Sequence, residues 1–418
     1  MIPPQVALVV WIVVAVAFFA MLTPLRAFLL TYVIGYLVLP VEVGSGITFK
    51  GAIVISQSLR IDKLTACHIG VILGALIFSP QVFRRFKWHW VDAAFGIVVG
   101  GLFATSMVNG LGPKDGLSNA VSQAREWLPL IVLSRMFITN VGELYEAMRV
   151  MVGGAALYAV LAVLEFRFSP QAHRLVYGYF QHDFSEFARY DHFRPVGFLH
   201  HAIELSFLMG TSAAMAGWLW YKGLMKKPLW GTVPAWGVFA AIFVGLLVTM
   251  TYSGYAAFAL CVGCLALMTV VRTRWLLWLL PALAMVWMVG RYTGVIDASL
   301  LLKGAGMVDT RREASLEYRL TSEQIHLDYA SSDVWLGKGG TDAMIRGADG
   351  RVAMAVDAWW MIQLTFYGLA GLGGWYLVWC AGIWAAFWRW KKLTPDLRTT
   401  ATITAVLIGA QFIDFLFN

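Results

Sequence analysis

Apolar stretches of about 20 residues recur along the whole chain, and this repetition constrains the fold more than any single motif. Each stretch is long enough to cross the hydrocarbon core of a membrane as an α-helix. Hydrophobic residues make up 59% of the chain and charged residues only 13%, whereas about 25% of an ordinary soluble domain is charged. A water-soluble fold cannot hide so much apolar surface, so lipid must cover it. The sequence therefore predicts an all-α, polytopic integral membrane protein.

About twelve transmembrane helices are expected from these stretches. The first has no basic residue before it and no small-residue cleavage site, so it is expected to be a retained span. Segment 41–63 is ambiguous and can hide a re-entrant piece. The expected spans lie near residues 5–22, 25–40, 64–80, 91–108, 119–138, 147–166, 197–219, 233–250, 253–271, 275–290, 360–388 and 400–416.

The basic residues predict the topology, because short cytoplasmic loops are enriched in lysine and arginine. The net charge of +8 is therefore attributed to topology, and no nucleic-acid partner is expected. The loops at 167–196 and 291–356 then emerge together on the opposite face. The long loop is expected to form a small helical cap on a single integral membrane domain that comprises residues 1–418. The short basic connections lie near 84–87, 221–227, 271–274 and 389–392.

The four cysteines lie in or beside apolar segments. Cys261 and Cys264 form a CxxC pattern, but no further ligand flanks it. Buried free thiols are therefore favoured over a redox or metal site.

Arginines in the two polar loops are candidates for binding a phosphate group. Arg189 and Arg194 lie in ARYDHFRPVGF, and Arg319 lies in SLEYRLTSEQ of the long loop. A guanidinium presents a planar fork of donors that matches phosphate oxygens, and it stays charged at any workable pH. The alternative is that these arginines contact lipid headgroups or nearby acids at the interface.

His200, His201 and Glu204 are expected at the start of the next helix. His200 and Glu204 are four residues apart, so they share a helix face and can hydrogen-bond. An ionisable residue within a span indicates function, although a structural pair that ties the helix to its neighbours is an equal alternative. No metal site is expected, because HHxxE is not HExxH and the sequence places no third ligand.

Asp357 lies where the long loop returns to apolar sequence, in front of Trp359 and Trp360. A carboxylate beside aromatic side chains can accept a proton from a sugar hydroxyl, and the tryptophans can form a platform for a sugar ring. The alternative for Asp357 is a helix N-cap, because Asp is a favoured cap residue. Both roles are compatible.

Three further features favour structural roles. Glu165 ends an apolar run and is expected at the membrane interface. Asp414 is an acid within a span, and the sequence does not reveal its partner. The GKGG of residues 337–340 lacks the spacing of a phosphate loop and is expected to form a turn.

Several of these motifs occur together in a familiar order. EFRFSPQAHRLVYGYF and FARYDHFRPVGFLHHAIEL are followed by TYSGYAAFAL, LEYRLTSEQIHLDYASSDVWLGKGGTD and DAWWMIQLTFYGLAGL. In their order and spacing they resemble the bacterial O-antigen polymerase and O-antigen ligase superfamily, and the branch that polymerises exopolysaccharides is the nearest. The resemblance extends from about Leu128 to the C-terminal DFLFN.

The resemblance implies a glycosyltransferase of the polytopic GT-C type in the bacterial inner membrane, with its active site facing the periplasm. Members take a glycan from undecaprenyl diphosphate and pass it to an acceptor hydroxyl, with inversion and without a metal or other cofactor. Arg194 matches the arginine before the Gly and His of the first family motif, and Arg319 matches the loop arginine ahead of VWLGKGG. The family assigns both arginines to the diphosphate, and Arg189 is an extra contact. The implied partners are membrane lipid and the lipid-linked oligosaccharide; the need for a chain-length regulator stays open.

Two departures separate this chain from the ligases of the superfamily. Ligases usually have His-Pro-Asn after the first arginine, where this chain has His200-His201-Ala202. They also end the large loop in His-Asn, where this chain has Asp357-Ala358. The resemblance then implies that Asp357 replaces the histidine as the base, and it favours a polymerase over a ligase.

A transporter or flippase for the same lipid-linked sugars is the competing class. Transporters carry polar residues near the membrane midplane, on helices interrupted by Gly or Pro. Here the charged candidates collect at one face and in a large one-sided loop, which favours catalysis at the membrane surface.

Overall fold

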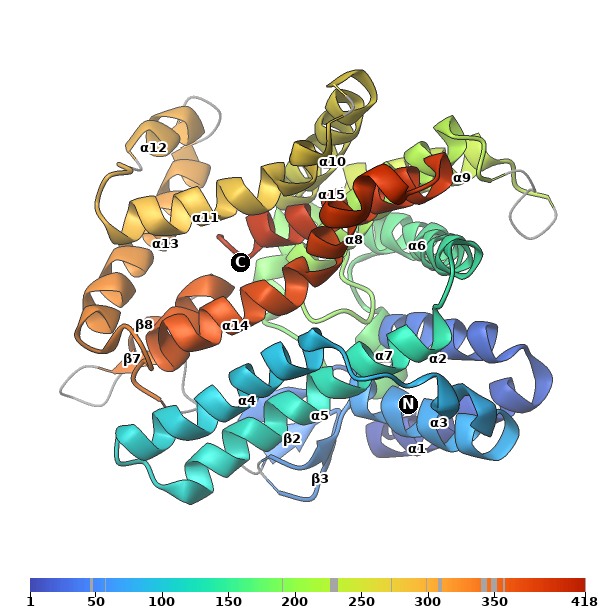
Figure 1. Cartoon of the computed structure of the whole chain (residues 1–418), viewed down its shortest axis with the longest axis horizontal. Helices are drawn as coiled ribbons and strands as arrows, with labels where there is room; N and C mark the ends of the chain where they lie inside the picture. The colour runs from blue at the N-terminus through green and yellow to red at the C-terminus, as the bar shows by residue number, and fades with distance from the viewer. Residues whose placement is uncertain are drawn as a thin grey trace. The chain divides into compact units, whose positions relative to one another are not determined.

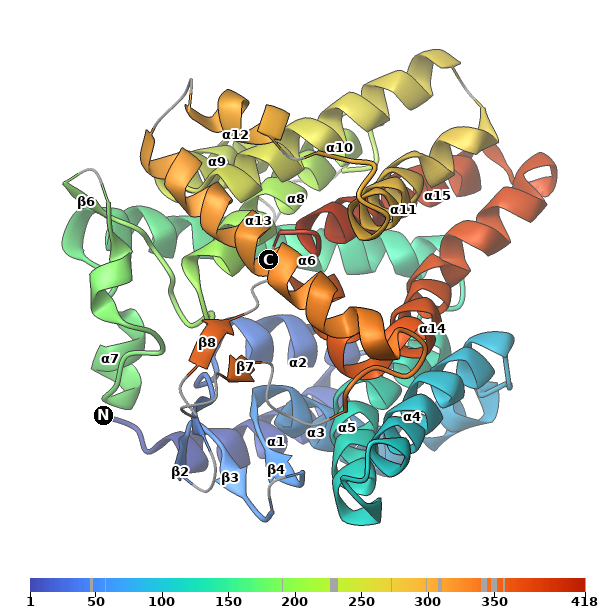
Figure 2. The same ribbon diagram turned by 90° about the vertical axis from the view of Figure 1, so that its left-hand side faces the viewer.

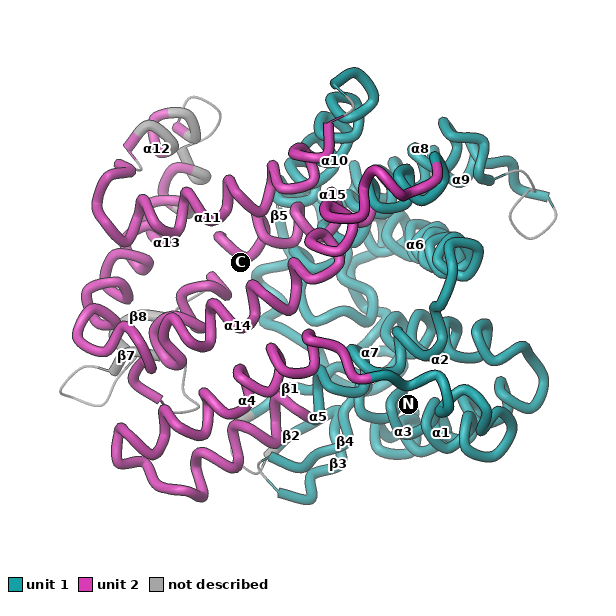
Figure 3. The backbone as a smooth tube through the Cα atoms, viewed as in Figure 1, with its two compact units in different colours: residues 1–87, 125–271, 395–403 teal, residues 88–124, 272–394, 404–418 magenta. Residues whose placement is uncertain are grey.

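The computed structural model of the chain is mostly α-helical (Figure 1). By internal packing the chain divides into two compact units (Figure 3). Unit 1 contains residues 1–87, 125–271 and 395–403, and unit 2 contains residues 88–124, 272–394 and 404–418. The structure describes residues 1–45, 48–56, 58–189, 191–225, 232–271, 273–297, 299–306, 310–339, 344–346, 352–355 and 358–417.

Unit 1 is built mainly of apolar helices that pack through small residues. Gly210 of α8 and Gly254 of α10 lie so close that a Cβ atom at Gly210 would be 2.3 Å from the carbonyl oxygen of Gly254. Small residues allow membrane helices to approach in this way. The helices of unit 1 are α1 (Pro4–Met21), α2 (Pro24–Val38), α3 (Lys63–Phe78), α6 (Val141–Phe168), α7 (Ala172–Tyr177), α8 (Ala202–Tyr221), α9 (Ala235–Val248) and α10 (Tyr252–Val271), with parts of α5 (Pro113–Phe137) and α15 (Pro395–Asp414).

Unit 2 contains the long loop and the helices on either side of it. Helix α14 packs against α4 (Figure 1) and against α13 (Figure 2). A hydrophobic core of this unit includes Trp360 and Met361 of α14, Leu327 of α13 and Ala284 of α11. The helices of unit 2 are α4 (Trp90–Val108), α11 (Leu279–Tyr292), α12 (Ser299–Gly306), α13 (Thr310–Ala330) and α14 (Trp359–Arg389), with the remaining parts of α5 and α15.

Short antiparallel hairpins occupy parts of the connections. Segment 41–63, where a re-entrant piece was an open possibility, contains two of them, and the long loop contains a further hairpin besides its helices α12 and α13. The pairs are β1 (Val43–Ser45) with β2 (Thr48–Lys50), β3 (Ile53–Val54) with β4 (Arg60–Ile61), β5 (Ala188–Arg189) with β6 (His192–Phe193), and β7 (Met344–Arg346) with β8 (Val352–Ala355). Short 3₁₀ helices lie at Pro80–Arg85, Phe184–Phe187, Arg274–Trp278, Ser331–Asp333 and Trp390–Lys392.

Seven helical segments in the described part of the chain are long and apolar enough to cross a membrane. The prediction of a helical membrane protein agrees with this composition, whereas the number of twelve spans stays a prediction. The seven are Pro4–Met21, Trp90–Val108, Val141–Phe168, Ala202–Tyr221, Tyr252–Val271, Arg274–Tyr292 and Trp359–Lys392; shorter apolar helices are Pro24–Val38, Lys63–Phe78 and Ala235–Val248.

Helix α14 is interrupted at Gly368, whose φ of 64° lies in a region that L side chains rarely adopt. At this break the backbone of α14 forms hydrogen bonds with residues 334–339, which precede the helix in the sequence. The amide of Leu369 donates to the carbonyl of Val334 (2.7 Å), and the amide of Lys338 donates to the carbonyl of Thr365 (2.8 Å). Gly337 and Gly339 also have positive φ. Residues 337–339 of GKGG therefore contribute backbone to this contact, and Gly340 lies outside the described residues.

Candidate functional site

Glu165 organises the polar loop of unit 1. It lies near the end of α6, is only 4% exposed, and accepts three backbone hydrogen bonds. Its Oε2 accepts from the amides of Val196 (2.8 Å) and Gly197 (2.7 Å), and its Oε1 accepts from the amide of Ala172 (3.1 Å). One carboxylate thus ties both ends of the loop to the helix. The sequence favoured a structural role for Glu165 but did not predict these backbone partners.

The same loop delays the start of the following helix. A span was expected from residue 197, but α8 begins at Ala202. Residues 196 and 197 give their amides to Glu165, and Gln181 donates to the carbonyl of Gly197 (2.9 Å). These bonds hold the chain in turns, so the helical hydrogen-bond pattern starts later.

Arg194 is buried at the end of the β5–β6 hairpin, with 3% of its surface exposed. Its guanidinium donates to Oγ1 of Thr251 (2.9 Å), and its amide donates to the carbonyl of Phe187 (2.7 Å). Arg189 lies in β5 of the same hairpin and is partly exposed. The burial of Arg194 argues against contact of its side chain with lipid headgroups at the outer surface.

His201 caps α8 and belongs to a compact polar cluster. Its Nδ1 accepts from the amide of Ile203 (3.1 Å), and its Nε2 lies 3.4 Å from Oε2 of Glu186. Nδ1 of His182 lies 3.5 Å from the same carboxylate oxygen. Burial, reinforced by the positive charge of Arg194, lowers the pKa of His201 to about 4, so the ring is neutral at pH 7.

Glu204 joins His200 to α2. Its Oε2 accepts from the backbone amide of His200 (2.8 Å), and its Oε1 accepts from the hydroxyl of Tyr36. The ammonium of Lys63 lies 4.0 Å from the centre of the Tyr36 ring. The expected proximity of His200 and Glu204 is present, but it uses the backbone of His200 rather than its ring.

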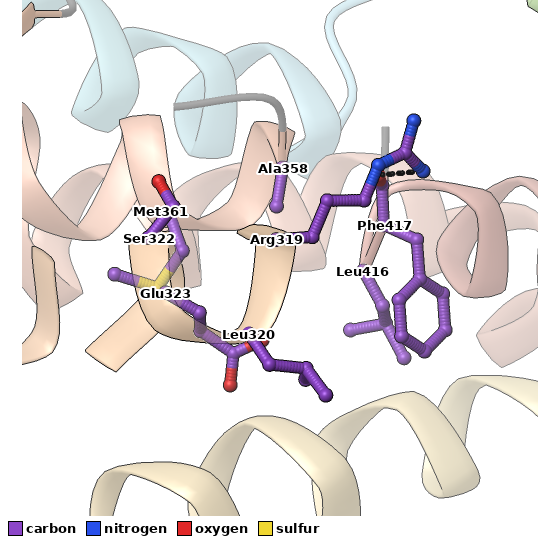
Figure 4. A pocket seen from close by; sticks show the side chains of 8 residues that line it. All are labelled: Arg319, Leu320, Ser322, Glu323, Ala358, Met361, Leu416 and Phe417. Atoms are coloured by element: carbon purple, nitrogen blue, oxygen red, sulfur yellow. Dashed lines mark hydrogen bonds between the residues drawn. The ribbon is translucent and has the colours of Figure 1, made fainter. Parts of the chain in front are cut away.

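In unit 2, Arg319 lines a small pocket between α13 and the C-terminal segment (Figure 4). Its guanidinium donates to the carbonyl of Phe417 (2.9 Å). The other lining residues are Leu320, Ser322, Glu323, Ala358, Met361, Leu416 and Phe417. Ala358 directly follows Asp357 in the sequence, and Asp357 itself lies outside the described residues.

The two tryptophans after Asp357 have different surroundings. Helix α14 begins at Trp359, with Ala358 in the cap position. Trp360 is 1% exposed and belongs to the core of unit 2. Trp359 is partly exposed and stacks on Phe415, with ring centres 4.5 Å apart. Of the pair, Trp359 therefore has the more accessible ring.

A buried ion pair fixes α13, which carries Arg319, against α11. Nε of Arg291 lies 2.5 Å from Oε1 of Glu323, and the two side chains are 10% and 4% exposed. Arg291 also donates to the carbonyl of Ile296 (3.0 Å). Burial raises the pKa of Glu323, while Arg291 acts in the opposite direction.

Arg291→Ala should lower the free energy of unfolding by about 3 kcal/mol, because it leaves the Glu323 carboxylate buried without its cation. The measurement is thermal unfolding of the purified protein in detergent. The double variant Arg291→Met/Glu323→Leu removes both charges and should recover most of the loss. Equal melting of Arg291→Ala and the unsubstituted protein would show that the pair does not hold α13.

Sequence reasoning overlooked three polar residues. His182 and Glu186 come 19 and 15 residues before His201, so only the folded loop places them beside it. His326 of α13 is 0% exposed, and neither ring nitrogen has a hydrogen-bond partner in the described part of the chain. Burial lowers its pKa to about 4. No spacing pattern marked it, since it lies in an otherwise ordinary amphipathic segment.

The sequence-predicted residues thus fall into two groups. Arg189, Arg194, His200, His201 and Glu204 lie in unit 1, at or just before the start of α8. A further group lies in unit 2 and comprises Arg319, Trp359 and Trp360. Comparisons of the chain with family models, curated proteins and solved structures find no match.

Proposed function

We propose that this protein is a membrane glycosyltransferase that polymerises oligosaccharide repeat units carried by undecaprenyl diphosphate. The proposed reaction takes place on the periplasmic side of the bacterial inner membrane, inverts the configuration at the transferred sugar, and uses no metal or other cofactor. The observation that carries the proposal is the placement of Arg319. This arginine lies on a polar loop helix, in a pocket whose wall includes the residue that follows Asp357.

The apolar spans suit the substrate as well as the location. A polyprenyl chain stays in the hydrocarbon, while its diphosphate and sugars lie at the membrane surface. Arginines suit a diphosphate, because a planar guanidinium donates two parallel hydrogen bonds to phosphate oxygens. Arg194 and Arg319 are the proposed diphosphate ligands, with Arg189 as an additional contact.

In the proposed step, the bond between the sugar C1 and the diphosphate oxygen breaks as the acceptor hydroxyl attacks C1 from the opposite face. The hydroxyl proton passes to the carboxylate of Asp357. Negative charge develops on the leaving diphosphate, and preorganised arginines stabilise it there. His200, His201, Glu204, Trp359 and Trp360 are the proposed contacts to the sugars and the lipid-linked substrate.

Two alternatives share most of these features. A ligase would pass the glycan to lipid A–core rather than to another repeat unit. A flippase would move the lipid-linked sugar without breaking a bond, and the interruption of α14 at Gly368 is a feature that transporter helices also have. The concentration of arginines and carboxylates in the two polar loops favours the transferase.

A reconstituted assay tests the proposal. The purified protein in detergent is incubated with undecaprenyl-diphosphate-linked repeat units and EDTA, and the products are separated by size on a gel. A ladder of lengthening chains is the expected result. Product that stays at one repeat unit until lipid A–core is added would identify a ligase. Failure of both reactions, together with movement of the lipid across liposomes, would replace the enzyme with a flippase.

A further inference from the structure

The polar loop of unit 1 gathers three side chains of the types that bind divalent transition metals. His182, Glu186 and His201 each present one ligand atom, and these atoms all lie within 4.8 Å of one another. Two imidazole nitrogens and one carboxylate oxygen form a frequent ligand set for zinc. We propose that these three residues bind one zinc-type divalent ion, with water in the fourth position.

The distances in the cluster fit such an ion. Around zinc, bonds of about 2.1 Å in tetrahedral geometry place neighbouring ligand atoms about 3.4 Å apart. Oε2 of Glu186 lies 3.4 Å from Nε2 of His201 and 3.5 Å from Nδ1 of His182. Two edges of the tetrahedron are therefore already present. The third edge, between the two histidines, requires only side-chain adjustment, and the rings are in edge-to-face contact with centres 4.9 Å apart.

Other contacts of the loop position the cluster and leave the ligand atoms of the three residues available to a metal ion. Asp183 accepts from the amide and the hydroxyl of Ser185 (2.9 and 3.0 Å), which fixes the turn between His182 and Glu186. Phe187 is buried in a small core with Val196 and Ala202. The segment with His182 and Glu186 is thereby packed beside the segment with His201.

One atom of the cluster indicates a missing ligand. Nδ1 of His182 is buried, and it has no hydrogen-bond partner in the described residues, because its contact with Glu186 lacks hydrogen-bond geometry. A buried polar atom without a partner is unusual and requires an explanation. A metal ion bound at this nitrogen supplies one.

Metal binding by His201 requires the loss of one hydrogen bond, the bond by which its ring caps α8. Nδ1 of His201 accepts from Ile203, so a neutral ring carries its hydrogen on Nε2 and directs it towards Glu186. An ion at Nε2 displaces that hydrogen to Nδ1 and breaks the cap bond. The loss of one helix cap is small beside the free energy with which proteins bind structural zinc.

The ion would reinforce a loop that Glu165 and Gln181 already hold in place. Its expected role is therefore structural, and the inference does not rest on the proposed glycosyl transfer. The metal-independent chemistry proposed above is unaffected, because none of its steps uses this ion.

The test is zinc binding by the full-length protein in detergent, without any lipid-linked sugar. Chelator-treated protein is equilibrated with zinc, and bound metal is measured by mass spectrometry and by competition with a chromogenic chelator. About one zinc per chain is expected for the unsubstituted protein. Glu186→Gln and His182→Ala should each reduce bound zinc to background.

His192→Ala is the matched control, because His192 is an exposed histidine of the same loop that lies outside the cluster. This variant should bind zinc as the unsubstituted protein does. Glu186 has a half-exposed side chain, so its replacement by glutamine should leave melting of the metal-free protein unchanged and separates lost binding from lost fold. Absence of bound zinc, or equal binding by all variants, would show that the cluster is only a set of polar contacts. Neither result would affect the gel assay of glycosyl transfer.

Discussion

Arg319→Ala is expected to reduce polymer formation by about 100- to 1,000-fold, the loss that follows removal of one preorganised donor to a developing anion. In the proposed reaction that anion is the departing diphosphate. Arg319 is the cationic residue of α13 that lines the pocket, and its guanidinium donates to the carbonyl of Phe417. The measurement is the rate at which the product ladder lengthens in the reconstituted assay.

Two further variants test whether the planar guanidinium of Arg319, rather than positive charge in the long loop, is what polymer formation requires. Arg319→Lys keeps the positive charge but loses the planar fork, so activity should stay well below that of the unsubstituted protein. Lys303→Ala removes an exposed cation from the same long loop and should leave the rate unchanged. Thermal unfolding of each variant identifies a loss of fold. Undiminished chain length with folded Arg319→Ala would remove Arg319 from the proposed diphosphate site.

The long apolar helices were predictable from sequence because lipid imposes a simple physical rule on a chain that crosses it. Every backbone polar group in the hydrocarbon must be satisfied internally, so a long apolar run becomes a helix. The helix α6, for example, begins and ends within about six residues of its expected span at 147–166. Polar segments follow no such rule, which is why the hairpins at 43–61 and the late start of α8 were not predicted.

The sequence identified several residues of the candidate site, but it did not predict the residues to which they hydrogen-bond. Arg194, His201 and Glu204 stood out because charged groups are rare in an apolar chain. Their partners Thr251, Glu186 and Tyr36 are ordinary residues that the fold brings close from distant positions. The partners of Glu165 could not be predicted either, because they are backbone amides, which every residue except proline has.

Glu165→Ala should lower the free energy of unfolding by about 4 kcal/mol, because hydrogen bonds to a charged group contribute about 1.5–3 kcal/mol each and do not add fully. The three bonded amides belong to residues 172, 196 and 197. Their loss should free the loop that carries Arg194 and His201. The measurements are thermal unfolding in detergent and the rate of tryptic cleavage at the exposed Arg174.

Glu146→Ala is the matched control on the same helix. Glu146 pairs with Arg26, whose side chain is 59% exposed, and an exposed pair contributes at most about 1 kcal/mol. Glu165→Gln keeps an acceptor oxygen but directs an amide group at backbone donors, so its melting temperature should fall between those of the two alanine variants. If Glu165→Ala melts and resists trypsin as Glu146→Ala does, the carboxylate does not hold the loop. The candidate residues of unit 1 would then need a different anchor, and Gln181, with its bond to Gly197, would be the next residue to replace.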